Sequence, residues 1–167
     1  WAVPLALAGV LWMLAPHGLP ARWLGCALLL PAVLVVPPRP AHGEAWIDTL
    51  DVGQGLAVLV RTRGHALLYD AGPAWGEADS GERVILPVLR ALGVPRLDRM
   101  LVTHNDLDHT GGAISVLDNL EVGELLSSLP AGHPVLSFAP RQRPCLRGER
   151  WDWDGVRFEV LHPAANE

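Results

Sequence analysis

The stretch THNDLDHTGG, Thr103–Gly112, decides how the rest of this chain is interpreted. It places two histidines and two aspartates, His104, Asp106, Asp108 and His109, within six consecutive positions. Imidazole nitrogens and carboxylate oxygens together form a ligand set that suits divalent transition metals. On so short a turn, four side chains can converge only if the backbone curls around a common centre. The stretch therefore predicts a metal-binding loop.

The flanking sequence separates this prediction from a plainer one, a polar turn in which Asp108 or Thr110 caps the following helix. The apolar run 99–103 predicts a short strand that leads straight into the loop, and a Gly pair then opens a predicted helix over 111–117. Ligands at the carboxyl end of a strand are typical of α/β proteins. We therefore favour the metal site over the capping turn.

The chain ahead of the loop has the pattern of a sheet. Three apolar runs, Trp46–Val52, Leu56–Arg61 and Ala66–Tyr69, predict strands separated by Gly-containing turns. The third run ends in Asp70, which places a carboxylate at the sharp exit of a strand.

Further elements complete the predicted α/β order. Apolar spacing predicts a helix over 83–92, and Pro87 inside it means that the helix starts late or is kinked. A short strand is expected around Val122–Leu126. His65 and His133 fall in predicted turns, where we expect them to be solvated.

The first 36 residues have a different composition from the rest of the chain. Two apolar runs, Trp1–Ala15 and Trp23–Val36, flank the turn Pro16–Arg22, and Arg22 is their only charge. Each run is shorter than the roughly 20 residues that span a bilayer. No positive segment precedes the first run, which argues against a signal peptide. Two interpretations stay open, a buried hairpin of a soluble protein and the end of a polytopic membrane region cut by the start of the sequence.

We favour the membrane interpretation and divide the chain accordingly. Transmembrane segments are expected over 1–36, a stiff Pro-rich linker over 37–44 and a second domain over 45–167. The arginine in the turn indicates that the turn faces the cytoplasm, which would place the second domain outside it.

Composition limits the interactions of the second domain. The chain has a net charge of −5, so bulk charge does not indicate nucleic-acid binding. A local exception is RQRPCLRGERWDWDGVR, residues 141–157, where basic and aromatic residues alternate. Such groups can grip phosphates and stack on bases, although WDWD is equally typical of a half-buried strand or turn. The candidate DNA contacts are Arg141, Arg143, Arg147 and Arg150.

The loop resembles a known motif. Its pattern H-x-D-x-D-H followed by Gly-Gly resembles the metal-binding motif of the metallo-β-lactamase fold, which ordinarily reads H-x-H-x-D-H. Asp70, in LLYDAGP, matches an aspartate of that fold which supports the metal loop by hydrogen bonding. The resemblance implies an α/β fold of the αββα sandwich type, of which this chain holds an incomplete first half. Asp106 replaces the usual second histidine, so the ligand set is richer in oxygen and Mn²⁺ becomes as plausible as Zn²⁺.

Four segments in this order, LDVGQGLAVLV, LLYDAGP, ILPVLRALGV and LVTHNDLDHTGG, are similar to the ComEC family of DNA-internalisation competence proteins. This resemblance implies a multi-pass protein of the inner (cytoplasmic) membrane that imports single-stranded DNA during natural transformation, together with other components of an uptake machinery. Its lactamase-like domain is implied to be a metal-dependent nuclease, a phosphodiesterase, acting on the strand that is not imported.

Residue by residue, the resemblance assigns metal ligation to His104, Asp106, Asp108 and His109. Asp108 would also orient or deprotonate the attacking water, and Asp70 would hold the ligands from behind. Later motifs of the family would lie beyond Glu167, so we expect two ions only in the full-length domain and no activity from this chain alone. Two other functions stay open, a hydrolase of acyl esters or lactams and a non-catalytic module that guides DNA.

Overall fold

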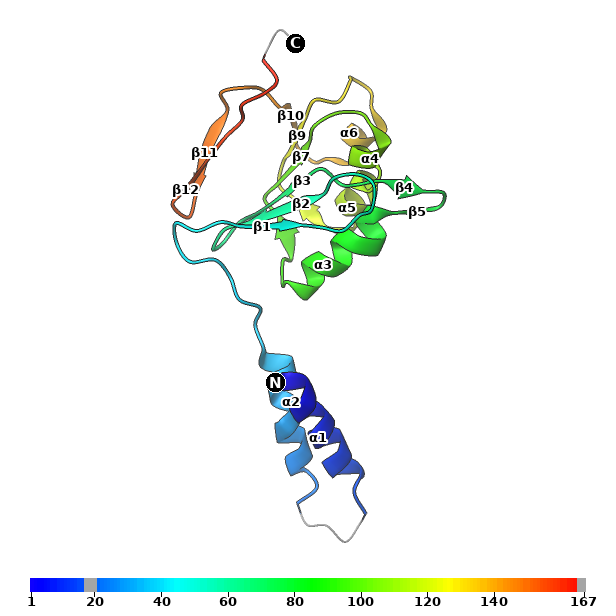
Figure 1. Ribbon diagram of the computed structural model, residues 1–167, viewed down its shortest axis with the longest axis vertical. Helices are drawn as coiled ribbons and strands as arrows, with labels where there is room; N and C mark the ends of the chain where they lie inside the picture. Colours follow the sequence, from blue (N-terminus) through cyan, green and yellow to red (C-terminus); the bar gives the residue numbers. More distant parts are fainter. Residues whose placement is uncertain (17–20, 165–167) are drawn as a thin grey trace. The chain divides into compact units, whose positions relative to one another are not determined.

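The computed structural model describes residues 1–16 and 21–164. The chain forms two compact units, Trp1–Pro37 and Pro38–Glu167, each described here by itself (Figure 1). Most of the predicted turn Pro16–Arg22 lies outside the described residues.

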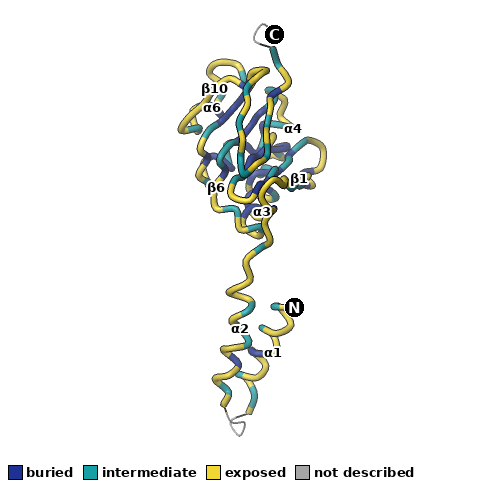
Figure 2. Tube along the Cα trace, turned by 90° about the vertical axis from the view of Figure 1, so that its left-hand side faces the viewer, coloured by how far each residue is buried: buried dark blue, intermediate teal, exposed yellow. Residues whose placement is uncertain are grey.

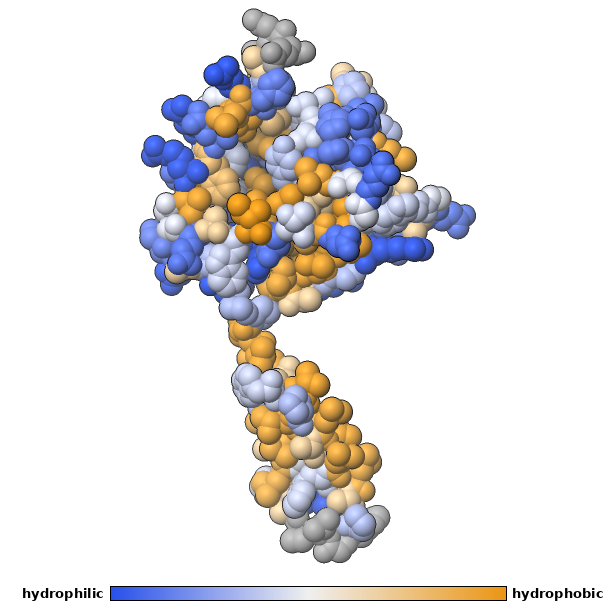
Figure 3. Space-filling view, in the orientation of Figure 1, coloured by the Kyte–Doolittle hydropathy of each residue, from blue (hydrophilic) through white to orange (hydrophobic). Residues whose placement is uncertain are grey.

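The first unit is a pair of helices, α1 (Ala2–Leu14) and α2 (Leu24–Leu34). Their only buried residues among those described are Gly9 and Gly25, which face each other so closely that a Cβ on Gly9 would lie 2.6 Å from the Gly25 carbonyl oxygen. The large apolar side chains point outward instead, and the surface of this unit is apolar over most of the face seen in Figure 3. None of the described helices is long and apolar enough to cross a membrane.

The second unit is built on a six-stranded sheet. The strands are β1 (Trp46–Thr49), β2 (Val58–Arg61), β3 (Ala66–Tyr69), β7 (Arg99–Val102), β9 (Leu125–Ser127) and β10 (Gln142–Pro144), in that order across the sheet. Pairing is antiparallel from β1 to β3 and parallel from β3 to β10. Because β3 and β7 are parallel neighbours, their carboxyl ends meet at one edge of the sheet, and this edge carries the ligand loop.

Short elements connect these strands. They are the pair β4 (Ala74–Trp75) and β5 (Ala78–Asp79), the π-helical segment η1 (Gly81–Ile85), α3 (Leu86–Ala91), the pair β6 (Arg96–Leu97) and β8 (Glu121–Val122), α4 (Leu107–Thr110), α5 (Ala113–Asn119) and α6 (Pro134–Phe138). A hairpin, β11 (Arg150–Trp153) and β12 (Val156–Glu159), follows β10.

The sheet alternates its side chains between two faces. Leu68, Met100 and Leu125 point into the main core beneath η1, α3, α5 and α6, whereas Leu101 and Leu126 point to the opposite face. This alternation follows from the two-residue period of a strand. Figure 1 shows the helices on one side of the sheet and the β11–β12 hairpin on the other, and Figure 2 shows the buried residues concentrated in the strands and helices of this unit. The α/β order predicted from the sequence is confirmed.

Several element bounds differ from the prediction. β3 has the predicted bounds, but β1 ends at Thr49 rather than Val52, and the strand expected around Val122–Leu126 is split into β8 and β9. The helix expected over 83–92 changes from π to α geometry at Leu86, directly before Pro87, which has no N–H to donate to the preceding turn. Of WDWD, Trp151–Trp153 lie in the half-buried strand β11 and Asp154 in the turn that follows it.

Candidate metal centre

Asp70 is the residue around which the site is organised. It follows β3 with a φ of 58°, a left-handed conformation that aspartate tolerates better than most residues, and its side chain is fully buried. Its Oδ1 accepts a hydrogen bond from the Thr103 backbone N–H at 2.8 Å, and its Oδ2 accepts from the Thr103 hydroxyl and the His109 Nδ1, each at 2.8 Å. The carboxylate therefore joins the ends of β3 and β7 to the far end of the loop.

These hydrogen bonds orient both histidines. His109 donates its Nδ1 proton to Asp70, so its Nε2 carries the free lone pair. The Thr103 hydroxyl gives its proton to Asp70 and so accepts from the His104 Nδ1, 2.8 Å away, which leaves the Nε2 of His104 free as well. One buried carboxylate thus sets the tautomer of two imidazoles, one directly and one through a hydroxyl.

The four predicted ligands lie as two pairs. The His104 Nε2 is 3.3 Å from the Asp106 Oδ2, the His109 Nε2 is 3.7 Å from the Asp108 Oδ2, and the two imidazole rings are 4.0 Å apart between centroids. In the part of the chain that the structure describes, no three His, Cys, Asp or Glu side chains stand close enough to hold one ion. The sequence-predicted residues are therefore brought together as two neighbouring nitrogen–oxygen pairs.

The donor set in each pair fits a divalent metal. Two donors on one tetrahedral Zn²⁺, each about 2.0–2.2 Å from it, lie roughly 3.3–3.6 Å apart, close to the separations of both pairs. Each pair combines a neutral imidazole nitrogen with a carboxylate oxygen, which suits Zn²⁺ or Mn²⁺. Each would leave further positions on an ion for water or other ligands.

Backbone contacts fix the loop in place. The Asp108 carbonyl accepts from the Leu56 N–H at 3.1 Å, and the Ala71 N–H donates to the His109 carbonyl at 2.8 Å. Gly55, at a φ of 139°, passes so close to the Asp108 carbonyl that a Cβ there would collide with it. The loop is thus held between the β1–β2 turn and the segment after β3.

The capping alternative is wrong. The residue at the N-cap of α4 is Asp106, and that of α5 is Gly112, and neither makes a side-chain cap hydrogen bond. Asp108 and Thr110 both lie inside α4. The carboxylate of Asp106 consequently remains available on the loop, 74% exposed.

Thr103 is a residue of the candidate site that the sequence analysis missed. Its hydroxyl connects Asp70 to His104. The signal in the sequence was its position, a hydroxyl residue at the end of a predicted strand directly before the first ligand, but its partner lies 33 residues earlier.

The candidate DNA contacts do not form a single basic cluster. Arg143 pairs with Glu124 and with Glu149, each at 2.6 Å, and Arg150 pairs with Glu159 at 2.8 Å. The Arg143 guanidinium lowers the pKa of the Glu124 carboxyl, although burial acts in the opposite direction. Arg141 and Arg147 are exposed and form no ion pair within residues 1–16 and 21–164.

The neighbouring aromatic side chains are engaged in packing. Trp151 stacks on Phe158 with centroids 5.1 Å apart and lies beneath the Arg99 guanidinium at 4.2 Å. It packs against the smaller core between the hairpin and the sheet. The sequence pattern therefore reflects a half-buried hairpin more than an open stacking surface.

Two histidines predicted to be solvated in fact make hydrogen bonds to other residues of the chain. The Nδ1 of His65 lies 3.0 Å from Asp154, and its ring stacks on Trp153. His133 is the N-cap of α6 and accepts from the Val135 N–H. Both positions are turns, as expected, but each imidazole has a defined structural partner.

A family model described as the metallo-beta-lactamase superfamily matches residues 50–162. The chain belongs to this superfamily. The match includes Asp70, Thr103 and the whole ligand loop, and it confirms the metallo-β-lactamase-like α/β fold predicted from the loop motif.

Several bacterial proteins are similar to this chain over most of its length. It is 39% identical over 162 residues to Competence protein ComA of Neisseria gonorrhoeae and 38% identical over 119 residues to Recombination protein 2 of Haemophilus influenzae. It is 37% identical over 155 residues to Uncharacterized protein YcaI of Escherichia coli. These alignments cover 96%, 70% and 92% of the chain but only 21%, 14% and 19% of the relatives. The predicted resemblance to the ComEC family is confirmed.

Proposed function

We propose that this chain is part of a membrane protein that imports single-stranded DNA during natural transformation, and that residues 45–167 belong to its metal-dependent phosphodiesterase domain. The observation that carries the proposal is the hydrogen-bond network of Asp70, which contacts His109 directly and His104 through the Thr103 hydroxyl. It leaves the Nε2 atoms of both histidines next to carboxylates. The similarity to Competence protein ComA supports DNA as the substrate.

In this proposal His104 and Asp106 contribute to one ion and Asp108 and His109 to a second. Divalent ions bound there would activate water and offset negative charge on the phosphate. Asp108, with its carboxylate at the open side of the loop, orients the attacking water and accepts its proton. The buried Asp70 and the half-buried Thr103 keep both imidazoles in the tautomer that binds metal.

Residues 1–36 are proposed to be embedded in the inner membrane as part of a multi-pass region, with the second domain extracytoplasmic. Exposed apolar side chains and a Gly–Gly helix contact support this proposal. Val3, Leu11 and Val33 are 68%, 69% and 79% exposed, which is costly in water and favourable in lipid. Helices in membranes pack through small residues because lipid provides no hydrophobic drive between them, as Gly9 and Gly25 do here.

Exposed arginines are proposed to contact the DNA backbone. Arg141 and Arg147 are the strongest of the four candidates because neither is in an ion pair within the described residues, whereas Arg143 and Arg150 must first leave a carboxylate. In the same proposal, the protein works together with other components of a DNA uptake machinery.

The test uses the protein to its natural ends, incubated with labelled single-stranded DNA and either Mn²⁺ or Zn²⁺. We expect metal-dependent cleavage that is lost in the His104→Ala/Asp108→Ala double variant and kept in His65→Ala, a histidine with a similar aspartate partner away from the loop. Cleavage of an acyl ester instead of DNA would point to the generic hydrolase. DNA binding by a folded, metal-loaded protein without cleavage would favour the guiding module.

A further inference from the structure

A basic pocket of about 150 Å³ lies in the second unit, away from the candidate metal centre. We define it by Arg39, Arg61, Arg63 and Arg96, which line it together with the β2–β3 turn and the segment from Leu92 to Asp98. The β2–β3 turn precedes β3 and Asp98 precedes β7, whereas the ligand loop follows these strands. The pocket is therefore at the opposite end of the sheet, and a ligand in it does not reach the reacting atoms.

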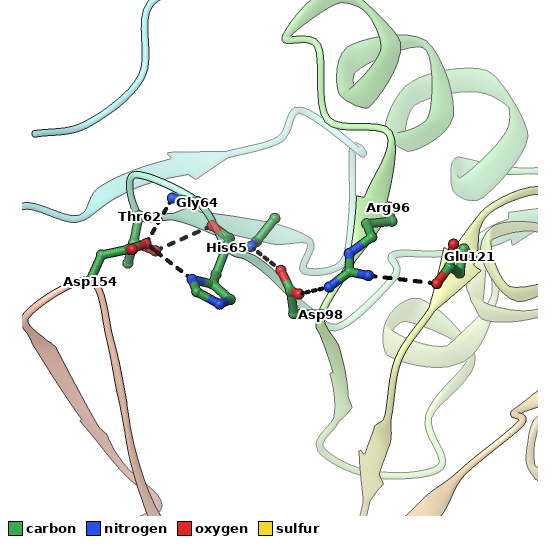
Figure 4. Close-up of polar contacts among 8 residues, drawn as sticks. Thr62, Gly64, His65, Arg96, Asp98, Glu121 and Asp154 are labelled. Atoms are coloured by element: carbon green, nitrogen blue, oxygen red, sulfur yellow. Dashed lines mark hydrogen bonds and ion pairs between the residues drawn. The ribbon is translucent and has the colours of Figure 1, made fainter. Parts of the chain in front are cut away.

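The charges of the pocket are only partly compensated. Arg61 is buried and pairs with Asp48 at 2.9 Å, and Arg96 pairs with Asp98 at 2.6 Å and with Glu121 at 3.7 Å. Arg39 and Arg63 are exposed and have no ion-pair partner within residues 1–16 and 21–164. Asp98 also accepts a hydrogen bond from the Ala66 N–H at 3.0 Å, so part of its charge is used by the backbone, and Figure 4 shows Arg96 between Asp98 and Glu121. The pocket thus presents two free guanidinium groups, which favours an anion.

Hydrogen bonds to Asp154 hold the backbone at the rim of the pocket. Asp154, at the tip of the β11–β12 hairpin, accepts from the Thr62 hydroxyl at 2.6 Å, the Gly64 N–H at 2.7 Å and the His65 Nδ1 at 3.0 Å (Figure 4). These three donors belong to the turn that carries Arg63. The Asp154 carbonyl also accepts from the Gly43 N–H at 2.7 Å, which fixes the linker that carries Arg39. These contacts hold the backbone on both sides of the pocket, so little backbone entropy is lost when an anion binds.

The position of Arg39 in the chain indicates which anion. Arg39 follows Leu34, the last residue of α2, by five residues, and five extended residues reach at most about 18 Å. If α2 is embedded in lipid, Arg39 lies at the lipid–water interface, where basic residues next to a membrane segment attract anionic headgroups. The phosphate of a phospholipid is the anion that is always present at the lipid–water interface.

We propose that the basic pocket binds the phosphate of an anionic phospholipid and so holds the second unit against the membrane surface. This inference rests on the membrane embedding of residues 1–36 proposed above, but not on the nuclease activity. Arg39 and Arg63 contact the headgroup, whereas Arg96, paired with Asp98 and Glu121, and Arg61, paired with Asp48, form part of the wall.

The protein is tested in phosphatidylcholine nanodiscs into which phosphatidylglycerol is titrated, with hydrogen exchange of segments 61–66 and 92–98 as the readout. We expect phosphatidylglycerol to protect both segments. Arg39→Gln/Arg63→Gln should raise the amount needed by about fivefold per arginine removed, from the typical contribution of one basic residue at a membrane surface. The matched control is Arg83→Gln/Arg90→Gln, which removes the same charge from exposed positions outside the pocket and should leave the titration unchanged.

The outcomes separate this proposal from the one it rests on. A protein that fails to stay with nanodiscs of either composition overturns the membrane embedding and the lipid site together. A protein that stays with both but shows no phosphatidylglycerol-dependent protection, or equal loss in both double variants, overturns the lipid site alone. Protection by single-stranded DNA in phosphatidylcholine discs, without an effect of phosphatidylglycerol, would assign the pocket to nucleic acid and also overturn it.

Discussion

Two aspartates at opposite ends of the sheet have nearly the same surroundings. Asp70 and Asp154 both adopt a positive φ, 58° and 51°. Each accepts hydrogen bonds from one threonine hydroxyl, one backbone N–H and one histidine Nδ1. In both places the carboxylate joins segments that are distant in the sequence.

The two histidines differ in what lies beyond them. The Nε2 of His109 faces Asp108, and a second histidine lies 4.0 Å from its ring. The ring of His65 lies flat on Trp153, with an interplanar angle of 6°. A carboxylate that orients an imidazole is therefore common to both sites, and the groups around the far nitrogen decide whether the histidine can serve a metal or only the fold.

The largest expected effect comes from removing each carboxylate. Asp70→Ala leaves the donors on Thr103 and His109 unsatisfied in a fully buried position, and we expect a loss of about 3–5 kcal/mol in the free energy of unfolding. Asp154→Ala should cost less because water can reach its partners. Urea unfolding at neutral pH measures both. Equal losses would contradict the difference in burial on which the comparison depends.

The next largest effect is on metal affinity, which should depend on His109 and not on His65. His109→Ala removes a proposed ligand, and we expect it to weaken Zn²⁺ or Mn²⁺ binding by more than the roughly 10–100-fold typical of losing an outer hydrogen-bond partner. His65→Ala should leave affinity unchanged, and Asp70→Asn should fall between them. Calorimetric titration of the protein with each ion checks the order. If His65→Ala weakened binding as much as His109→Ala, the proposed ligand set would be incorrect.

The two sites also differ in how far the sequence predicted them. Asp70 and the loop were predicted because their signals are local, an apolar run ended by a carboxylate and four ligand types within one short segment. The bounds of β3 were predicted for the same reason. The helix α4 inside the loop was not, because four residues are too few to show a helical period.

The contacts of Asp154 could not be predicted, because they join positions about 90 residues apart. A threonine, a glycine and a histidine in one turn have no pattern that indicates a distant carboxylate. The role of Thr103 was missed for a related reason, since it depends on β3 and β7 being parallel neighbours. Strand adjacency is set by the whole fold, and local patterns do not encode it.

Glycine substitutions next to the two sites give a smaller effect. Gly55→Ala places a Cβ against the Asp108 carbonyl, and Gly155→Ala places one 2.7 Å from the His42 ring. Both have positive φ, 139° and 86°, so each should cost about 1–3 kcal/mol. Only Gly55→Ala should also weaken metal binding, by about tenfold, because it shifts a ligand-bearing backbone. Gly53→Ala is the control for strain alone, since no atom lies within 4 Å of its added Cβ.

The smallest effect is a pH dependence at the Asp154 site. Hydrogen bonds from Thr62, His65 and Gly64 lower the pKa of the Asp154 carboxyl below its ordinary value of 3.8. A carboxyl whose pKa is lower in the folded state stabilises the protein above its unfolded pKa, and this contribution is lost as the pH falls below that value toward the folded pKa. The stability difference between the wild type and Asp154→Asn should thus be constant from pH 7 to about pH 5 and shrink below about pH 4. Urea unfolding of both proteins across this range measures the difference. A difference that stayed constant to pH 2 would mean that Asp154 holds its turn by geometry alone, and the likeness to Asp70 would then lie in the arrangement of donors and not in their effect on the charge.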